Sequence, residues 1–278
     1  MPADDTERYV RANRDLWNAV TPHHVTSRFY DVEGFKAGRA RRRTGMAELE
    51  ITLVGDVRGK TLLHLQCHFG MDTIGWAQRG AIVTGIDFSS EAIQAARRLA
   101  AEMGVPATFV ESDVYDLPRN VQGRFDVVFT SHGVLGWLPE LERWARVIAH
   151  FLAPGGRFYL IEAHPFAWVF DDQRTDGELK VTFPYFPGPE PLRFERDGSY
   201  AAPDAPVRRV EYTWMHPLAD VIGALLRAGL RLEAFAEYPY VAWAMFPWME
   251  ERADGAWQLP GGAPTLPLMF SLSASKPA

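Results

Sequence analysis

The sequence predicts an α/β fold with a mostly parallel sheet and helices on both faces. Between residues 61 and 162, apolar runs of strand length alternate with stretches in which apolar residues recur every three or four positions. That alternation is typical of strand–helix–strand units, whose strands run parallel. The composition is ordinary for a globular protein, because 47% of the 278 residues are apolar and 23% are charged. A chain of this length can bury a core without disulfides or structural metals.

Five strands and three helices are predicted within this region. The strand runs are residues 61–65, 81–86, 107–110, 125–130 and 157–162. The helical stretches between them are residues 73–79, 91–103 and 140–152. Ser89 and Ser90 are suitable N-cap residues for the second helix, and Gly104 is a suitable stop.

Two flanking regions are expected to cover the sheet, and two C-terminal strands bring the predicted number of strands to seven. Helical patterns at residues 6–19 and 35–53 predict a helical lid over residues 1–57. Residues 165–207 are rich in proline and aromatic residues, and we expect them to form a substrate-side insertion after the fifth strand. A helix and two final strands follow, at residues 216–228, 230–238 and 266–274. The predicted core therefore comprises residues 58–164 and 208–278.

Charge, cysteine content and hydropathy exclude or disfavour several classes of function. The net charge of −6 disfavours nucleic acid as a partner, and the basic residues between 36 and 43 are interpreted as a solvated helix face. A single cysteine excludes an internal disulfide framework, and we expect no metal site. No run of about 18 apolar residues indicates a membrane span, and residues 1–8 resemble neither a signal nor a transit peptide. We therefore expect a cytoplasmic protein, and we expect it to be a monomer or a homodimer.

Ligands of open parallel sheets bind at the carboxyl ends of the strands, so the loops there are the candidate site. The first loop, residues 66–72, has Gly70 as its one glycine, whereas a dinucleotide fingerprint has three. Asp87 ends the second strand and is placed to accept the hydrogen bonds of a ribose diol; the alternative is that it caps the following helix. Asp113 follows the third strand and is placed to receive an adenine amino group, or else it belongs to a surface turn.

Five segments in order resemble the core of class I S-adenosylmethionine-dependent methyltransferases, which have a Rossmann-like, seven-stranded fold. They are LLHLQCHFG at residues 62–70, GIDFS at 85–89, SDV at 112–114, FDVVF at 125–129 and LAPGGRF at 152–158. The resemblance implies that the cofactor is S-adenosyl-L-methionine and that S-adenosyl-L-homocysteine is a product. It also implies that Gly70 lies near the methionine moiety, that Asp87 holds the ribose hydroxyls, and that Asp113 and Val114 contact the adenine.

The first segment departs from the family pattern. Gln66 and His68 stand where the family usually has glycine, and they either hydrogen-bond the cofactor carboxylate or fill the space that glycines would leave. Cys67 is interpreted as a buried packing residue rather than a nucleophile. Phe88 and Ser131, each at the end of a predicted strand, complete the expected cofactor contacts.

Methyl transfer from a sulfonium is an in-line displacement, so a proton acceptor is needed only where the acceptor atom is still protonated. Histidine is the natural base near neutral pH, and His132 and His164 follow the fourth and fifth strands. Of the two, we rank His132 first and His164 second as the candidate catalytic base. For each of them, a hydrogen-bonded structural histidine is the alternative.

Aromatic and polar-tipped side chains are the candidates for the acceptor side. Those expected to bind substrate are Trp17, Tyr30, Phe166, Trp168, Tyr185 and His216. Aromatic walls suit a flat or apolar acceptor, because ligand pockets are largely apolar with a few placed polar groups. The same residues could instead form a dimer surface, cover the sheet or pack the N-terminal helix.

The sequence therefore predicts a methyltransferase acting on an oxygen or nitrogen of a small, aromatic or apolar metabolite. Residues 130–133 read Thr-Ser-His-Gly rather than Asn-Pro-Pro-Tyr, which disfavours modification of nucleobase amino groups. One alternative is a non-catalytic regulatory or scaffold protein of the same fold that binds the cofactor. Another is a Rossmann oxidoreductase that uses NAD(P), which the crowded first loop disfavours.

Overall fold

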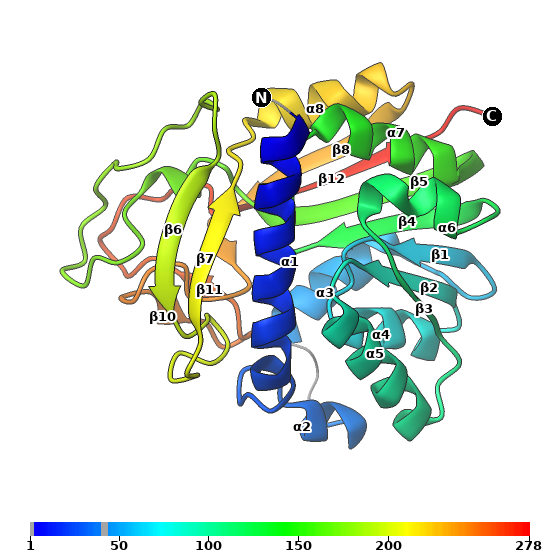
Figure 1. Ribbon diagram of the computed structural model, residues 1–278, viewed down its shortest axis with the longest axis horizontal. Coiled ribbons are helices and arrows are strands. Elements are labelled where there is room, and N and C mark those ends of the chain that lie inside the picture. The colour runs from blue at the N-terminus through cyan, green and yellow to red at the C-terminus, as the bar shows by residue number, and fades with distance from the viewer. Residues whose placement is uncertain (1–2, 40–43) are drawn as a thin grey trace.

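The computed structural model describes residues 3–39 and 44–278, and its centre is a seven-stranded sheet (Figure 1). The strand order is β3-β2-β1-β4-β5-β12-β8. Neighbouring strands from β3 to β5 pair in parallel, and β12 is antiparallel to both β5 and β8, so the predicted mostly parallel sheet is confirmed. The strands are β1 (Thr61–His64), β2 (Ile82–Asp87), β3 (Thr108–Glu111), β4 (Phe125–Ser131), β5 (Leu152–Ala163), β8 (Arg231–Tyr238) and β12 (Met269–Ser275).

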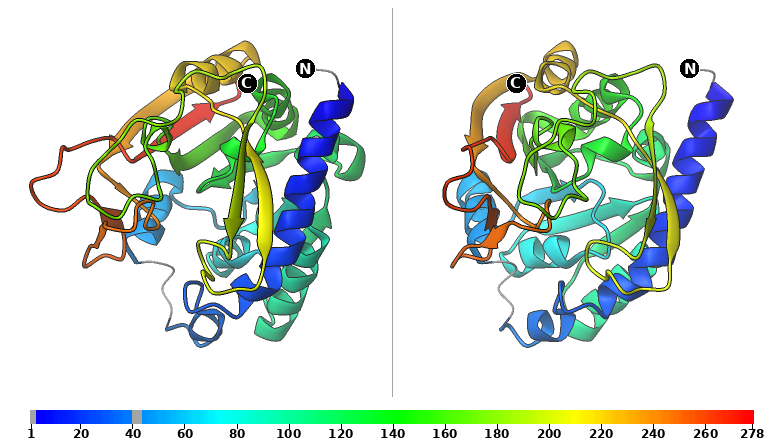
Figure 2. Two further views of the ribbon diagram at one scale, coloured as in Figure 1. Left: turned by 60° about the vertical axis from the view of Figure 1, so that its left-hand side comes forward. Right: turned by 90° about the vertical axis from the view of Figure 1, so that its left-hand side faces the viewer.

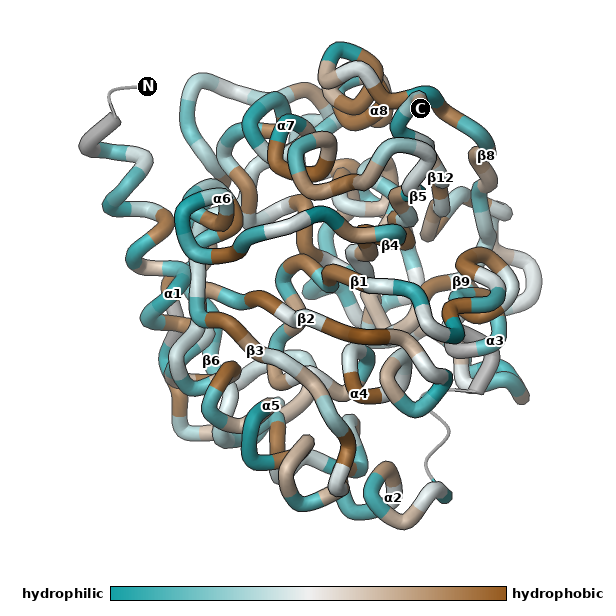
Figure 3. Tube along the Cα trace, turned by 90° about the vertical axis from the view of Figure 1, so that its right-hand side faces the viewer, coloured by the Kyte–Doolittle hydropathy of each residue, from teal (hydrophilic) through white to brown (hydrophobic). Residues whose placement is uncertain are grey.

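Side chains that alternate along the strands anchor helices on both faces of the sheet. Leu63 of β1 packs in one cluster with Trp144 and Val221, and the adjacent Leu62 packs on the opposite face with Trp76. One face is thus covered by α7 (Leu141–Phe151) and α8 (Leu218–Arg227), and the other by α4 (Met71–Gln78) and α3 (Thr44–Val54). Figure 3 shows the hydrophobic stretches along β1 and β2 between these layers.

Local signals explain where α5 (Ser90–Met103) begins and ends. The Ser89 hydroxyl accepts a hydrogen bond from the Ala92 N–H, as expected of an N-cap residue. Gly104 adopts a left-handed conformation directly after the last turn. The helix therefore matches the predicted range, and its N-terminus lies beside the end of β2. The short elements α6 (Leu117–Asn120), η1 (Val114–Asp116) and η2 (Leu135–Trp137) lie in the connections around β4.

The N-terminal segment forms α1 (Ala3–Val25), which is longer than predicted because it continues through Pro22. It packs against α5 and against β7 (Arg208–Thr213). The Asn13 side chain binds both backbone groups of Tyr212, donating to its carbonyl at 2.8 Å and accepting from its N–H at 2.9 Å. Figures 1 and 2 show α1 standing beside this strand. The Asn13 side chain thus joins α1 to the backbone of β7.

The helix predicted over residues 35–53 is wrong as a single element. The structure has α2 (Val32–Lys36) and the separate α3, with residues 40–43 outside the described part of the chain. Gly38 adopts a left-handed φ of 67° shortly after α2, which ends the helix. Arg41, Arg42 and Arg43 of the basic cluster lie outside the described residues. Lys36 forms ion pairs with Glu33 and Glu102.

The insertion contains an antiparallel hairpin of β6 (Leu192–Asp197) and β7, after a short turn, η3 (Ala167–Val169). The hairpin crosses the boundary predicted at residue 207 and stands beside the main sheet (Figure 2). A small sheet of β9 (Tyr240–Val241), β10 (Glu250–Glu251) and β11 (Trp257–Gln258) was not predicted. Across residues 3–39 and 44–278, none of the helices combines the length and hydropathy of a membrane span.

Candidate active site

A cavity of about 1480 Å³ opens at the carboxyl ends of the parallel strands. The loops after β1, β2, β3, β4 and β5 line one side, and residues from α1, the hairpin and the segment after β9 line the other. The order of the strands reverses between β1 and β4, which is where open α/β sheets bind their ligands.

The loop after β1 has an unusual backbone. Gln66, His68 and Gly70 adopt left-handed φ values of 55°, 50° and 78°. At Gly70 a Cβ atom would lie 2.6 Å from the Phe109 ring, so both space and conformation require glycine there. Residues 66, 68 and 70 all line the cavity, and α4 begins immediately after Gly70.

Gln66 presents an acceptor to this region. Its Nε2 donates to the Val134 carbonyl at 3.2 Å, which joins the loop after β1 to the loop after β4. Its Oε1 is buried and has no hydrogen-bond partner among the described residues. A buried amide oxygen without a donor is costly, so a ligand that donates a hydrogen bond there would be stabilised.

His68 connects the loop after β1 to α1 and, through His24, to the insertion. Its Nε2 lies 2.9 Å from Nδ1 of His24 on α1, and Nε2 of His24 lies 2.7 Å from the Ser199 hydroxyl of the insertion. Burial, together with the neighbouring His24, holds the pKa of His68 well below its usual value, so its ring is neutral. Trp17 and Tyr30 pack against the His68 ring. The three segments are therefore in contact across the mouth of the cavity.

Asp87 lies at the end of β2 and lines the cavity. Its two oxygens accept hydrogen bonds at 2.9 Å, one from the His68 N–H and the other from the Ser89 N–H. Burial raises the pKa of Asp87 to about 6. The alternative that Asp87 caps α5 is wrong, because the N-cap is Ser89. Each carboxylate oxygen keeps a second lone pair for a ligand.

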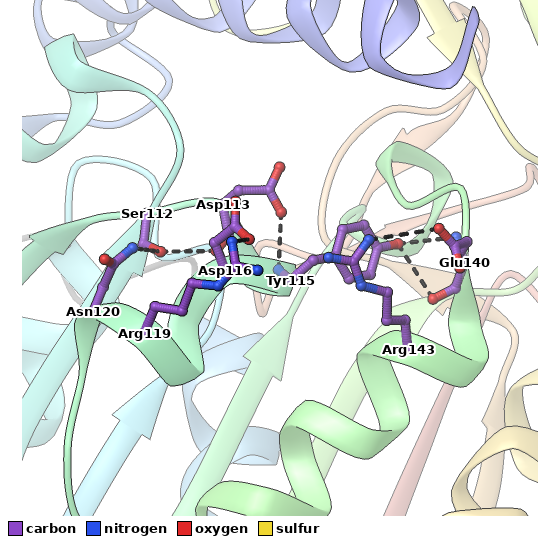
Figure 4. Close-up of polar contacts among 8 residues, drawn as sticks. All are labelled: Ser112, Asp113, Tyr115, Asp116, Arg119, Asn120, Glu140 and Arg143. Carbon is purple, nitrogen blue, oxygen red and sulfur yellow. Dashed lines mark hydrogen bonds and ion pairs between the residues drawn. The ribbon is translucent and has the colours of Figure 1, made fainter. Parts of the chain in front are cut away.

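Asp113 and Val114 begin η1, and both line the cavity. One Asp113 oxygen accepts from the Tyr115 N–H at 2.9 Å, and Figure 4 shows the other pointing away from the seven neighbours drawn. Burial raises the pKa of Asp113. Phe88 also lines the cavity, under the guanidinium of Arg14. Asp113 is thus a cavity residue and not part of a fully exposed turn.

His132 follows β4 and lines the cavity. Its Nε2 lies 2.7 Å from Oε1 of Glu50 on α3, and its Nδ1 is buried without a hydrogen-bond partner among the described residues. Ser131 lines the cavity beside it, and its hydroxyl donates to Asp72 at 3.4 Å. Sequence reasoning missed Glu50 because it lies 82 residues from its partner.

Glu162, at the end of β5, is the second residue that sequence reasoning missed. It is 3% exposed, and its carboxylate accepts four backbone hydrogen bonds of 2.6–3.0 Å. The donors are the N–H groups of Gly133, Val134, Leu135 and Ala163. Glu162 therefore fixes the loop that carries His132.

The other two predicted histidines, His164 and His216, make hydrogen bonds within the chain. His164 does not line the cavity: its Nε2 faces Glu237 at 2.9 Å and its Nδ1 accepts from the Phe166 N–H. This placement favours the structural alternative for His164. His216 lines the cavity, its Nε2 lies 2.7 Å from the Leu138 carbonyl, and burial lowers its pKa.

The predicted acceptor residues divide into two groups. Trp17, Tyr30 and Trp168 line the cavity, whereas Phe166 and Tyr185 are not among its lining residues. Phe166 is 36% exposed, and the Tyr185 hydroxyl accepts from the Leu218 N–H instead. The part of the cavity next to the insertion has further aromatic and apolar walls: Phe183, Phe194, Trp214, Trp243 and Met245.

The polar groups at the acceptor end are mainly carboxylates. Arg196 of β6 binds Asp172 at 2.6 Å and Glu211 at 3.4 Å, so its charge is neutralised within the wall of the cavity. Among the residues that the structure describes, no group of three or more histidine, cysteine, aspartate or glutamate side chains could hold a metal ion.

Comparison with known proteins shows that the core is similar to methyltransferases. Residues 63–158 match the model of a methyltransferase domain. The chain is 31% identical over 159 residues to a ubiquinone biosynthesis O-methyltransferase of Serratia proteamaculans, and 34% identical over 119 residues to one of Alkalilimnicola ehrlichii. These matches cover 56% and 42% of this chain, and 66% and 48% of the two relatives. The chain thus spans about half to two thirds of the length of these relatives.

Solved structures share the fold over most of the chain. An S-adenosylmethionine-dependent methyltransferase of Mesorhizobium loti superposes with a TM-score of 0.57 at 19% identity, covering 83% of this chain and 97% of that one. A glycopeptide N-methyltransferase in complex with S-adenosylmethionine superposes with a TM-score of 0.54 at 21% identity, covering 86% of this chain and 95% of that one.

Proposed function

We propose that this chain, a class I S-adenosylmethionine-dependent methyltransferase by its domain and fold, methylates an oxygen or nitrogen atom of a small aromatic molecule. One observation carries the proposal. A single cavity joins the ends of β1, β2 and β3, where the expected cofactor residues lie, to His132 and the aromatic walls of the insertion.

The residues present fit S-adenosylmethionine. Asp87 would accept the two ribose hydroxyls, because each of its oxygens accepts one backbone N–H and retains a lone pair. The outward oxygen of Asp113 would receive the adenine amino group. Gln66 Oε1, buried without a partner, would accept from the ammonium of the methionine moiety. Ser131, Phe88 and Val114 complete the walls around these groups.

When bound, the cofactor supplies an electrophilic methyl group on a positively charged sulfur. The chain contributes alignment and exclusion of water, which supply most of the catalysis in such a displacement. The lid formed by α1 and the insertion would close the mouth through the His24, His68 and Ser199 contacts. His132, which lines the cavity, would take a proton from the acceptor.

The acceptor side favours a flat molecule. Trp168, Trp214, Trp243 and Phe194 line this part of the cavity and provide apolar faces for an aromatic ring. The relatives are named as ubiquinone biosynthesis O-methyltransferases, which supports an oxygen atom as the methylated position. The net charge of −6 and the single cysteine support a cytoplasmic location and a partner other than nucleic acid.

Calorimetric titration with S-adenosylmethionine, S-adenosylhomocysteine and NADH tests the cofactor. We expect micromolar binding of both adenosyl ligands and none of NADH, and an Asp87→Ala variant that folds but binds S-adenosylhomocysteine more weakly. Transfer of labelled methyl groups to a panel of phenols and aromatic amines then tests the activity. Binding of NADH alone would overturn the proposal. Adenosyl binding without transfer to any acceptor would favour a non-catalytic cofactor-binding protein instead.

A further inference from the structure

We propose that Glu50 positions His132 so that Nδ1 of the imidazole is the proton acceptor, and that the methylated group is a hydroxyl. This inference rests on the proposed function and deepens it, because it assigns the substrate class and the role of a residue outside the methyltransferase domain match, which begins at residue 63.

The pair is geometrically well defined. Oε1 of Glu50 lies 2.7 Å from Nε2 of His132, and Glu50 is only 1% exposed. The two residues come from α3 and from the end of β4, and both line the cavity. The separation is that of a charge-assisted hydrogen bond between an imidazole N–H and a carboxylate.

The carboxylate decides which nitrogen carries the proton. When Glu50 is ionised, its carboxylate can only accept hydrogen bonds, so Nε2 of His132 is the nitrogen that donates to it. The lone pair is then on Nδ1, which is buried and has no hydrogen-bond partner among the described residues. A group that donates a hydrogen bond to Nδ1 is therefore what this site lacks, and a hydroxyl of the acceptor can supply it.

The backbone of His132 is held in a defined position. His132 has a left-handed φ of 55°, and its N–H donates to the Ile161 carbonyl at 2.7 Å. The four hydrogen bonds to Glu162 fix the residues that follow. A strained conformation held by so many contacts is characteristic of functional positions.

His164 provides the contrast within the same chain. Its Nε2 also faces a carboxylate, that of Glu237, at 2.9 Å. Its Nδ1, however, already accepts the Phe166 N–H, and the residue does not line the cavity. Of these two imidazole–carboxylate pairs, the pair with Glu50 is the one that lines the cavity and leaves an imidazole nitrogen without a partner among the described residues.

The reaction balances with this assignment. The hydroxyl proton moves to Nδ1 and the O–H electron pair stays on the oxygen, which forms the new bond to the methyl carbon. The sulfur–methyl bond breaks with its electron pair going to sulfur, so the sulfonium becomes a neutral thioether. His132 is left as an imidazolium beside the Glu50 carboxylate, and it returns the proton to solvent when the product leaves.

The first test is spectroscopic and needs no acceptor. Nitrogen-15 spectra of the histidine side chains distinguish the two neutral tautomers, and a His132→Asn variant assigns the signal among the eight histidines. We expect the Nε2–H tautomer for His132 in the wild type and in Glu50→Gln, whose carbonyl still accepts. We expect a mixture of tautomers in Glu50→Ala, and no change in the matched control Glu237→Ala. A wild-type Nδ1–H tautomer, or a Glu50→Ala spectrum identical to wild type, would overturn the assignment.

The second test uses two acceptors of similar shape, catechol and 1,2-phenylenediamine, with labelled S-adenosylmethionine. We expect methylation of catechol in preference to the diamine, and a loss of kcat of about 100-fold or more in Glu50→Ala, within the range of general-base catalysis. Glu50→Gln should recover part of that loss, and S-adenosylhomocysteine affinity should stay within about threefold of wild type in both variants, or about 0.7 kcal/mol. Preference for the diamine would overturn the hydroxyl assignment. Failure of the wild type to bind S-adenosylhomocysteine would instead refute the proposed function and leave the tautomer result standing.

Discussion

Replacing Glu162 by glutamine should destabilise the protein far more than its conservative chemistry indicates. Oε1 of Glu162 accepts the N–H groups of Gly133 and Ala163, each at 2.6 Å. Oε2 accepts those of Val134 and Leu135, at 2.7 and 3.0 Å. The amide of glutamine has one oxygen and one NH2 group, so two of the four backbone donors lose their acceptor whichever way the amide turns.

The magnitude follows from those two donors. A buried donor left without an acceptor costs about 1–3 kcal/mol, so the free energy of unfolding should fall by roughly 2–6 kcal/mol. For a chain of this size, about 1 kcal/mol corresponds to a Tm change of roughly 2–4 °C, which gives a decrease of roughly 4–24 °C. The loop that carries His132 should also loosen, so kcat should fall even at temperatures where the variant is folded.

Thermal unfolding followed by circular dichroism measures this effect, with Glu237→Gln as the matched control. Glu237 also binds a neighbour, His164, but its side chain is 48% exposed, so we expect a change below about 1 kcal/mol there. A Glu162→Gln variant whose Tm stays within about 2 °C of wild type would refute the reasoning, since the four hydrogen bonds would then contribute little.

Three further predictions concern the cofactor end and the lid. Burial raises the pKa of Asp87 to about 6, and ribose binding uses the ionised carboxylate. Calorimetry should therefore show that the affinity for S-adenosylhomocysteine is constant above about pH 6 and falls by up to about tenfold per pH unit below it. A flat profile down to about pH 5 would contradict the ribose assignment. Gly70→Ala should lower Tm more than Gly104→Ala. Both glycines have a left-handed φ, but a Cβ at Gly70 would lie 2.6 Å from the Phe109 ring, whereas a Cβ at Gly104 would meet open space. Equal losses of Tm would contradict this interpretation of the loop. His24→Phe should speed hydrogen exchange in residues 192–213, because it removes the hydrogen bond between His24 and Ser199, which is one of the contacts between α1 and the insertion. Unchanged exchange there would argue against a lid.

The sheet and its principal helices could be predicted because their signals are local. Each strand of the parallel core is a short apolar run, and α5 is bounded by Ser89 and Gly104, whose conformations match the helix ends. The N-terminal helices were harder to predict. Pro22 lies inside α1, whereas the second predicted helix is divided into α2 and α3, and periodicity alone does not show either feature.

The polar residues of the candidate site were predictable where they follow strands. Asp87, Asp113 and His132 lie at strand ends, and the structure places all three on the cavity. Glu50 and His24 come from helices near the N-terminus, and their partners lie 82 and 44 residues away along the chain. No spacing rule connects residues so far apart, because their proximity depends on how helices pack across the carboxyl ends of the sheet.

The loop after β1 shows which property of a glycine-rich motif this chain preserves. Gln66 and His68 stand where the family pattern has glycines, yet their φ values of 55° and 50° are ones that glycine adopts freely. Left-handed backbone costs residues with a Cβ roughly 1–2 kcal/mol each. Compensating contacts follow from the same two residues: the His68 N–H binds Asp87, its ring binds His24, and the Gln66 amide binds Val134. The backbone path of the loop is therefore retained, while the added side chains connect the loop to α1 and to the segment that carries His132.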